Sequence, residues 1–242
     1  MIWENVQIRP LGESAIVVQL GEGISPEVHH IIIQLINEIE KDPFHGFIET
    51  VPSYNSVTVY YNPVVINFEN QASKCDSSFQ KVNAFMHEYI KRINPTVEQR
   101  ERTIEIPVVY GGDYGPDLDM VATYNRLTPD EVIQLHSNQE YMVYMIGFSP
   151  GFPFLGGMDE QIATPRKTTP RQGIPQGSVG IAGKQTGIYP LETPGGWQII
   201  GCTPIELFLP NMSPPTLLQA GDKIRFTPIE AEEFLLYENR SK

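Results

Sequence analysis

Residues 164–204 carry a net positive charge within an acidic chain, so this segment is a candidate site for binding an anion. The segment holds four cations and one acid, whereas the whole chain carries a net charge of −12. A positive region within an acidic protein favours a small anion, such as a carboxylate or a phosphate, over a polyanion. The cations are Arg166, Lys167, Arg171 and Lys184.

Arg166 and Arg171 are the stronger candidates among these cations, because a guanidinium group can hold two oxygens at once. We predict that they act at a catalytic site by holding a carboxylate or a phosphoryl oxygen. The alternative is that they pair with surface acids, since the chain has 29 Asp and Glu residues. The sequence leaves both interpretations open.

Turns are expected to bring further polar and aromatic groups to the same region. His136 is the nearest candidate for a catalytic acid or base, and aromatic side chains would supply apolar walls. The alternative is that Gly and Pro build barrel corners while the aromatics fill the core. The other candidate binding residues are Phe148, Phe152, Gln185, Thr186, Tyr189, Trp197 and Thr203.

The sequence Gly147–Gly151 matches the G-x-S-x-G pattern of a hydrolase nucleophile, but its chemistry is wrong for that role. The pattern requires a backbone N–H after the serine, and Pro150 has none. All five histidines also precede Ser149, against the chain order of that fold. We therefore do not expect a serine nucleophile.

Residues 177–185 resemble a phosphate-binding loop only in part. The glycine spacing is one residue too long, and Gln185 replaces the hydroxyl that would bind magnesium. The alternation of Val179 and Ile181 indicates a strand instead. No cluster of His, Cys or carboxylate residues has usable ligand spacing, so we predict no metal site.

The N-terminal half predicts the element order ββαββα. The strands are expected near residues 6–8, 15–18, 47–51 and 57–61, and the helices after Ser25 and from residue 79 to 93. This order favours an α+β layer of the ferredoxin-like type. A polar, helix-ending stretch then places the domain boundary between residues 98 and 99, giving domains 1–98 and 99–242.

The C-terminal half begins with a strand and a short helical insert, and a capping-box pattern at Thr128 opens the second helix. Short apolar runs and frequent Gly and Pro then follow as far as the end of the chain. Many short strands with many turns indicate a barrel or a sandwich.

Composition and charge narrow the classes of partner. No apolar run approaches the roughly 20 residues that span a bilayer, and the first residues lack the pattern of a signal peptide. Two cysteines, Cys75 and Cys202, are too few for a disulfide framework. We expect a cytoplasmic protein that binds neither nucleic acid nor membrane.

Four long motifs resemble one known family, which is called the 5-oxoprolinase B subunit, KipI or allophanate hydrolase subunit 1. The resemblance extends over nearly the whole chain, including residues 9–14, 51–54 and 106–112 in its first part. It implies a cyclophilin-like β-barrel for the second domain. The motifs are residues 144–157, 164–171, 177–183 and 185–198.

The resemblance implies two roles. In the first, the chain is a non-autonomous part of an ATP-dependent 5-oxoprolinase complex that opens 5-oxo-L-proline to L-glutamate, together with a KipA-like C subunit and a third component, the A subunit. In the second, it inhibits autophosphorylation of a sporulation histidine kinase, and the KipA-like protein counteracts it. We rank the enzyme first, because a basic pocket suits a lactam that carries a carboxylate.

The resemblance also extends the candidate substrate-binding residues to Pro150 and Gly151. With Arg166 and Arg171 on an anion, Gln185 and Thr186 are expected to orient the amide. The family commonly carries Arg at the position of Cys202, so an anion contact from that position is expected to be lost.

Overall fold

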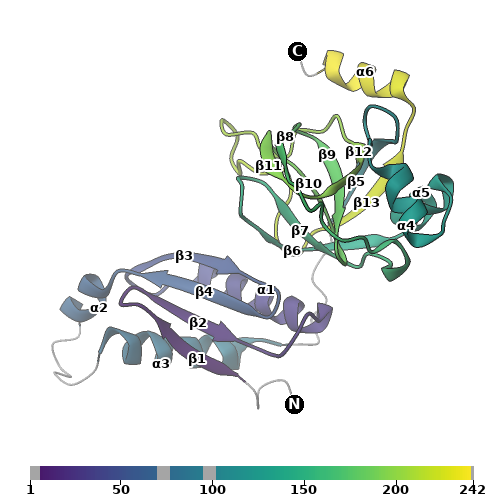
Figure 1. Ribbon diagram of the computed structural model, residues 1–242. Coiled ribbons are helices and arrows are strands. Elements are labelled where there is room, and N and C mark those ends of the chain that lie inside the picture. Colours follow the sequence, from purple (N-terminus) through teal and green to yellow (C-terminus); the bar gives the residue numbers. More distant parts are fainter. Residues whose placement is uncertain (1–5, 70–76, 95–101, 241–242) are drawn as a thin grey trace. The chain divides into compact units, whose positions relative to one another are not determined.

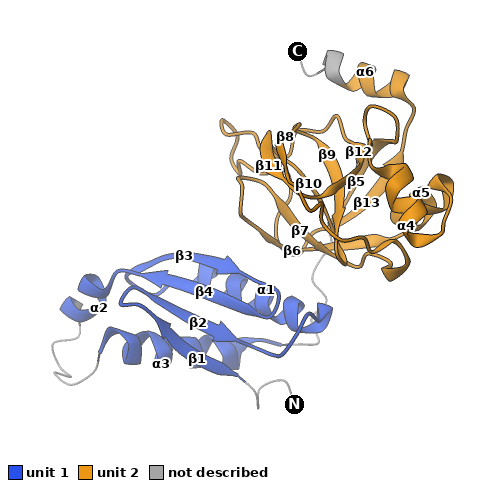
Figure 2. Cartoon of the chain, in the orientation of Figure 1, with its two compact units in different colours: residues 1–100 blue, residues 101–242 orange. Residues whose placement is uncertain are grey.

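The computed structural model describes residues 6–69, 77–94 and 102–240 (Figure 1). The chain divides into two compact units, residues 1–100 and 101–242 (Figure 2). The predicted boundary between residues 98 and 99 lies outside the described residues and stays a prediction.

The first unit is a four-stranded antiparallel sheet in the order β1-β2-β4-β3, packed against helices. Isoleucine, valine and leucine side chains from the sheet and from α1 and α3 form its core. Its elements are β1 (Gln7–Leu11), β2 (Ala15–Gln19), α1 (Pro26–Lys41), β3 (Phe47–Pro52), β4 (Ser56–Tyr61), α2 (Pro63–Glu69) and α3 (Ser78–Arg92).

The predicted start of the first helix is confirmed. The Ser25 hydroxyl accepts a hydrogen bond from the N–H of Val28 at 3.3 Å, and Pro26 is the first residue of α1. The short helix α2 was not predicted, so the observed order is ββαββαα. The ferredoxin-like label stays a prediction.

The second unit is mostly β. One seven-stranded sheet runs in the order β10-β9-β12-β5-β13-β6-β7, and a separate pair joins β11 to β8. The edge strands β10 and β7 lie against each other, so the large sheet is a nearly closed barrel. Its elements are β5 (Thr103–Tyr110), α4 (Leu118–Asn125), α5 (Pro129–Ser137), β6 (Glu140–Ile146), β7 (Pro153–Gly156), β8 (Arg171–Ile174), β9 (Ser178–Ala182), β10 (Gln185–Ile188), β11 (Thr193–Gly195), β12 (Gln198–Cys202), β13 (Lys223–Pro228) and α6 (Ala231–Arg240).

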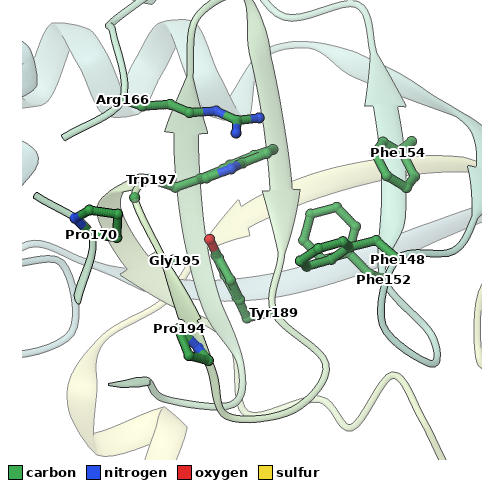
Figure 3. A pocket seen from close by; sticks show the side chains of 10 residues that line it. Phe148, Phe152, Phe154, Arg166, Pro170, Tyr189, Pro194, Gly195 and Trp197 are labelled. Atoms are coloured by element: carbon green, nitrogen blue, oxygen red, sulfur yellow. The ribbon is translucent and has the colours of Figure 1, made fainter. Parts of the chain in front are cut away.

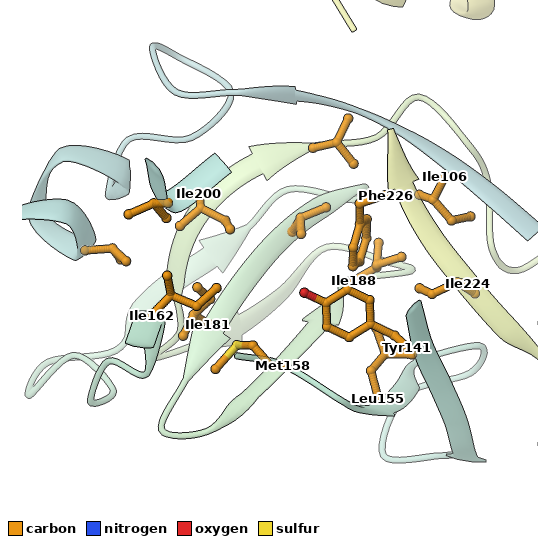
Figure 4. Packing of buried hydrophobic residues seen from close by; sticks show 14 of the residues in the cluster. Ile106, Tyr141, Leu155, Met158, Ile162, Ile181, Ile188, Ile200, Ile224 and Phe226 are labelled. Atoms are coloured by element: carbon orange, nitrogen blue, oxygen red, sulfur yellow. The ribbon is translucent and has the colours of Figure 1, made fainter. Parts of the chain in front are cut away.

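The barrel is filled by large apolar side chains from every strand of its wall (Figure 4). Tyr141 and Phe226 pack edge to face in this core, with ring centroids 5.2 Å apart. The strand predicted from the alternation of Val179 and Ile181 is confirmed as β9, and the prediction of a barrel or sandwich is confirmed as a barrel-like sheet.

The helical insert packs on the barrel at two places. Helix α4 contacts β12, and α5 contacts β13. The capping box predicted at Thr128 is confirmed, because its hydroxyl accepts from the Glu131 N–H and the Glu131 side chain accepts from the Thr128 N–H. The insert thereby fixes Asp117 beside β12 and His136 inside the barrel.

Candidate functional site

A cavity of about 400 Å³ opens in the wall of the second unit (Figure 3). Its walls come from the β6–β7 loop, from β7, from the segment before β8, and from the ends of β10, β11 and β12. The lining residues are Phe148, Phe152, Phe154, Arg166, Pro170, Tyr189, Pro194, Gly195, Gly196 and Trp197.

Aromatic rings give the cavity its shape. The ring of Phe152 lies edge-on to Tyr189 and to Trp197, with centroid distances of 5.8 and 5.7 Å. Arg166 lies over the ring of Trp197, with its guanidinium carbon 5.9 Å from the ring centroid. Edge-to-face packing and a cation over an indole both hold the rings in fixed positions, so the cavity has rigid apolar walls with one positive charge at its edge.

Tyr189 brings a hydroxyl to this apolar cavity. The side chain is 3% exposed, and within the described residues its hydroxyl makes no hydrogen bond. Burial raises the pKa of Tyr189 to about 12, although the charges of Arg166 and Arg171 act in the opposite direction. The hydroxyl is therefore protonated at neutral pH and can donate a hydrogen bond to a ligand.

Gly195 keeps the Tyr189 hydroxyl accessible. A Cβ atom at residue 195 would collide with that hydroxyl and with the side chain of Ile174. Gly187 lies below the same rings, and a Cβ atom there would come within 3.0 Å of Phe152. Both glycines are therefore required by the close packing of the aromatic wall.

Arg166 differs from the other three cations of the segment because it makes no ion pair with a described carboxylate. Lys167 and Arg171 both donate to Asp117, at 3.0 and 2.8 Å. Lys184 pairs with Glu160 at 2.7 Å on the exposed surface. Of the two arginines for which ion pairing was the alternative, Arg171 is paired, although its partner Asp117 is buried and is not a surface acid. Arg166 is left as the charge at the cavity.

Asp117 holds this part of the barrel together. Its carboxylate is buried and also accepts a hydrogen bond from the backbone N–H of Ile199 at 2.7 Å. Burial alone would raise the pKa of Asp117, but hydrogen bonds from Arg171, from Ile199 and from Lys167 together lower it. Asp117 stays ionised. It binds Lys167 in the segment before β8 and Arg171 at the start of β8, and Arg171 also donates to Trp197 O.

His136 lies in the barrel core and does not line the cavity. Its side chain is 0% exposed, and burial lowers its pKa to about 3. Nδ1 is 2.8 Å from the Tyr110 hydroxyl, and Nε2 is 2.8 Å from the Thr186 hydroxyl. Because the Thr186 hydroxyl donates to Gly180 O, it accepts from Nε2–H, and Nδ1 then accepts from Tyr110.

This network satisfies every polar atom of the His136 ring, so its position gives no support to the predicted role as a catalytic acid or base. Thr186 is bound in the same network and is equally buried. Both side chains belong to a hydrogen-bond network inside the barrel, and their predicted roles toward a substrate stay predictions.

Phe148 stands at the rim of the cavity in an unusual conformation. Its φ angle is 67°, in the left-handed region that favours glycine, and its side chain is 81% exposed. The turn is closed by a hydrogen bond from Gly147 N–H to Phe152 O at 3.0 Å. Strain and exposure of a large aromatic side chain together mark this position as a candidate for ligand contact.

The remaining predicted residues lie outside the cavity lining. Gly151 has a φ angle of 82° and packs against Leu207 and Phe208, and Thr203 accepts from the N–H of Ile205. These two residues shape the backbone. Pro150, Arg171, Gln185, Thr186 and His136 are the other predicted residues that the cavity lining does not include.

Sequence reasoning missed several wall residues, namely Phe154, Pro170, Pro194, Gly195 and Gly196. All five lie in motifs that carry the family resemblance, residues 144–157, 164–171 and 185–198, and those motifs were the signal that could have found them. The side chain of Cys202 contacts Gln176 O and Thr203 O and does not line the cavity, and the loss of an anion contact at this position stays a prediction.

Two further features are absent from the described residues. No group of three His, Cys, Asp or Glu side chains could hold a metal ion there. None of the helices is long and apolar enough to cross a membrane.

Comparisons with known proteins give one consistent result. The sequence model of one protein family, the carboxyltransferase domain, subdomain C and D, matches residues 6–218. The B subunit of 5-oxoprolinase from Bacillus subtilis is 48% identical over 97% of this chain and 98% of its own length. The protein of the same name from Escherichia coli O157:H7 is 41% identical over 90% of this chain and 94% of its own length.

A solved structure supports the same relationship. The protein named TTHA0988 has a TM-score of 0.74 and 32% identity over 90% of this chain, and this chain spans 40% of that longer one. Since the family model matches most of the chain and close relatives match nearly all of it, the chain belongs to the family of 5-oxoprolinase B subunits, within the carboxyltransferase domain family of subdomains C and D.

Proposed function

We propose that this chain is the B subunit of an ATP-dependent 5-oxoprolinase, which opens 5-oxo-L-proline to L-glutamate while ATP is hydrolysed. The observation that carries this proposal is the 48% identity to the 5-oxoprolinase B subunit of Bacillus subtilis over 97% of the chain. Identity of this size over both full lengths favours a shared role and not only a shared fold.

The aromatic cavity suits this substrate. 5-Oxoproline has a small, nearly flat ring and one carboxylate, and the cavity offers flat apolar walls and one cation without a carboxylate partner among the described residues, Arg166. We assign the carboxylate to Arg166, and the ring to the space between Phe152 and Trp197. The protonated hydroxyl of Tyr189 would donate a hydrogen bond to a substrate oxygen.

The lactam carbonyl must be activated by a group other than these side chains. A lactam is stable at neutral pH, so its carbonyl carbon must be made more electrophilic, for which phosphorylation of the lactam oxygen by ATP is a suitable step. Attack by one water molecule on that carbon then breaks the C–N bond, which leaves the nitrogen as the amine and the carbon as an acyl phosphate. A second water molecule hydrolyses the acyl phosphate, which releases inorganic phosphate and gives the side-chain carboxylate of glutamate. In this scheme Arg166 stabilises negative charge near the reacting group, and Arg171 acts only through its ion pair with Asp117.

The activity requires partners. We propose that the chain acts as a non-autonomous component beside a KipA-like C subunit and the A subunit, in the cytoplasm. A ferredoxin-like first domain and a cyclophilin-like second domain are part of the same proposal. Inhibition of a sporulation histidine kinase stays a prediction of the sequence, since no feature of the described residues favours it.

Reconstitution tests the proposed function. Glutamate and ADP would be measured for this chain alone, for the chain with its KipA-like partner, and for both with the A subunit. We expect ATP-dependent glutamate formation only in the complete mixture, and loss of activity when this chain is omitted. Equal activity with and without this chain would contradict the proposal, provided that the complete mixture has been shown to form the three-component complex.

A further inference from the structure

Asp117 lies outside the lining of the aromatic cavity but is bound to the segments that form one side of it. Its carboxylate accepts hydrogen bonds from Lys167 at 3.0 Å and from Arg171 at 2.8 Å. These two residues are the direct sequence neighbours of Arg166 and Pro170, which do line the cavity. Asp117 is thereby connected to the lining residues that precede β8.

Asp117 also fixes the start of β12. Its oxygen Oδ2 accepts from the Ile199 N–H at 2.7 Å, and its own N–H donates to Ile199 O at 2.8 Å. Ile199 is two residues after Trp197, whose ring lies under the guanidinium of Arg166 in the cavity wall. One residue therefore holds both the strand that follows Trp197 and the segment that carries Arg166.

The carboxylate of Asp117 is not used as its place in the chain would suggest. Asp117 is the N-cap residue of α4, where an aspartate side chain commonly accepts hydrogen bonds from the first N–H groups of the helix. Its side chain makes no such bond with α4, and its two oxygens bind Arg171, Lys167 and Ile199 instead. The buried charge thus serves the cavity wall and not the cap of its own helix.

We propose that Asp117 is a positioning residue for substrate binding, which holds Arg166 and Trp197 in the arrangement that receives 5-oxoproline. The inference rests on the proposed function, which supplies the substrate. Without the carboxylate, the segment before β8 loses its anchor, although the Lys167 N–H still donates to Gly196 O at 2.7 Å. The wall is therefore expected to loosen without separating, and the substrate would meet a cation and an indole whose separation is no longer fixed.

Steady-state kinetics of the assembled enzyme separate positioning from a purely structural role. Asp117→Asn keeps the size of the side chain and removes its charge. We expect the KM for 5-oxoproline to rise about tenfold while kcat changes by less than about threefold, because the substrate is bound by a misplaced wall. Partial unfolding would give the opposite result, since it lowers the amount of active enzyme, and with it kcat, but leaves KM unchanged.

Asp222 offers a matched control within the same unit. Asp222 is 6% exposed and Asp117 is 5% exposed. The Asp222 carboxylate also accepts from an arginine, Arg102 Nε at 2.8 Å, and from a backbone N–H, that of Gln219 at 2.7 Å. Because Asp222 does not line the cavity, Asp222→Asn should lower stability as Asp117→Asn does but leave KM within about twofold of the wild-type value.

Fluorescence reports the position of Trp197 without any need for activity. In a Trp3→Phe background Trp197 is the sole tryptophan of the chain, and its side chain is buried. We expect Asp117→Asn to shift the emission of Trp197 to longer wavelength and to increase its quenching by acrylamide, because a loosened wall admits solvent. Asp222→Asn should change neither property at a denaturant-free temperature well below unfolding.

Lys167→Met takes the place of Asp117→Asn if the latter does not fold, because Asp117 then keeps Arg171 and the Ile199 N–H as partners. We expect it to raise KM about threefold, with Lys184→Gln as the control for the loss of a paired cation.

An unchanged KM in Lys167→Met, or in a folded Asp117→Asn enzyme, would overturn the proposal, and so would an equal rise in Asp222→Asn. If the wild-type mixture forms no glutamate, the proposed function fails. The fluorescence difference between Asp117→Asn and Asp222→Asn then decides by itself whether Asp117 positions Trp197: a difference supports the positioning and identical spectra overturn it.

Discussion

Two aromatic regions of the second unit differ in how their polar atoms are satisfied. Around His136, in the barrel core, each ring nitrogen has a partner, Tyr110 for one and Thr186 for the other. Around Tyr189, in the cavity wall, the hydroxyl makes no hydrogen bond with a described residue and Arg166 has no described carboxylate partner. A satisfied network holds a fold together, whereas unsatisfied donors at a cavity are available to a ligand.

Two arginines that lie five positions apart in the sequence differ in the same way. Arg171 is bound to Asp117 and to the carbonyl oxygen of Trp197. Arg166 lies over the Trp197 ring, and its N–H groups bind no carboxylate of the described residues. The first is expected to control stability and the second to control binding.

Removal of the His136 side chain should have the largest effect on stability. His136→Ala leaves a cavity and takes a partner from two buried hydroxyls, so we expect a loss of about 4 kcal/mol in the free energy of unfolding. Urea unfolding in a Trp3→Phe background would follow Trp197 fluorescence alone. His136→Phe, which keeps the ring, should lose about 2 kcal/mol. Unchanged stability in both variants would break the comparison.

The two arginines give the next largest effect. Arg171→Gln removes one of the two cations that neutralise the buried carboxylate of Asp117. We expect a loss of about 2 kcal/mol of stability, which is less than for a fully buried ion pair because Arg171 is partly exposed. Arg166→Gln should change stability by less than about 0.5 kcal/mol. The same urea experiment checks both, and equal losses would show that Arg166 also has a structural role.

Stability should depend on pH through His136. Its pKa is about 3 in the folded chain and about 6.5 in an unfolded one, so the unfolded chain binds an extra proton between these values. The contribution of neutral His136 is therefore complete above pH 6.5 and is lost at about 1.4 kcal/mol per pH unit as the pH falls towards 3. Unfolding titrations at several pH values would show this contribution as a steeper slope in the wild-type chain than in His136→Phe, where only the carboxyl groups titrate in this range.

The smallest expected effect concerns Phe148. Phe148→Gly relieves the left-handed backbone and should raise stability by about 0.5 kcal/mol, whereas Phe148→Ala keeps the strain and should not. Both variants should weaken substrate binding, because both remove the ring at the rim. A stability change of the same sign and size in both variants would contradict the account of strain.

The elements were largely predictable from the sequence, because apolar periodicity and caps are local signals. The Ser25 cap and the Thr128 capping box are examples. The site was predictable only in part. Phe148, Phe152, Arg166, Tyr189 and Trp197 line the cavity as expected, but pairing between residues far apart in the chain decides the roles of the others.

Asp117 shows why. It lies 54 positions before Arg171, and no local pattern reveals that it binds this arginine and Lys167. The burial of His136 is equally invisible in the sequence, since a polar residue in the last turn of a helix is usually exposed. Only the closed barrel, with α5 packed against β13, brings His136 to Thr186.

The most direct test of the central claim measures 5-oxoproline turnover by the assembled enzyme that carries Arg166→Gln, with Lys184→Gln as the matched control. If Arg166 holds the substrate, kcat/KM should fall by about 100-fold in the first variant and remain unchanged in the second, with normal complex formation in both. Full activity of the Arg166→Gln enzyme would contradict the account.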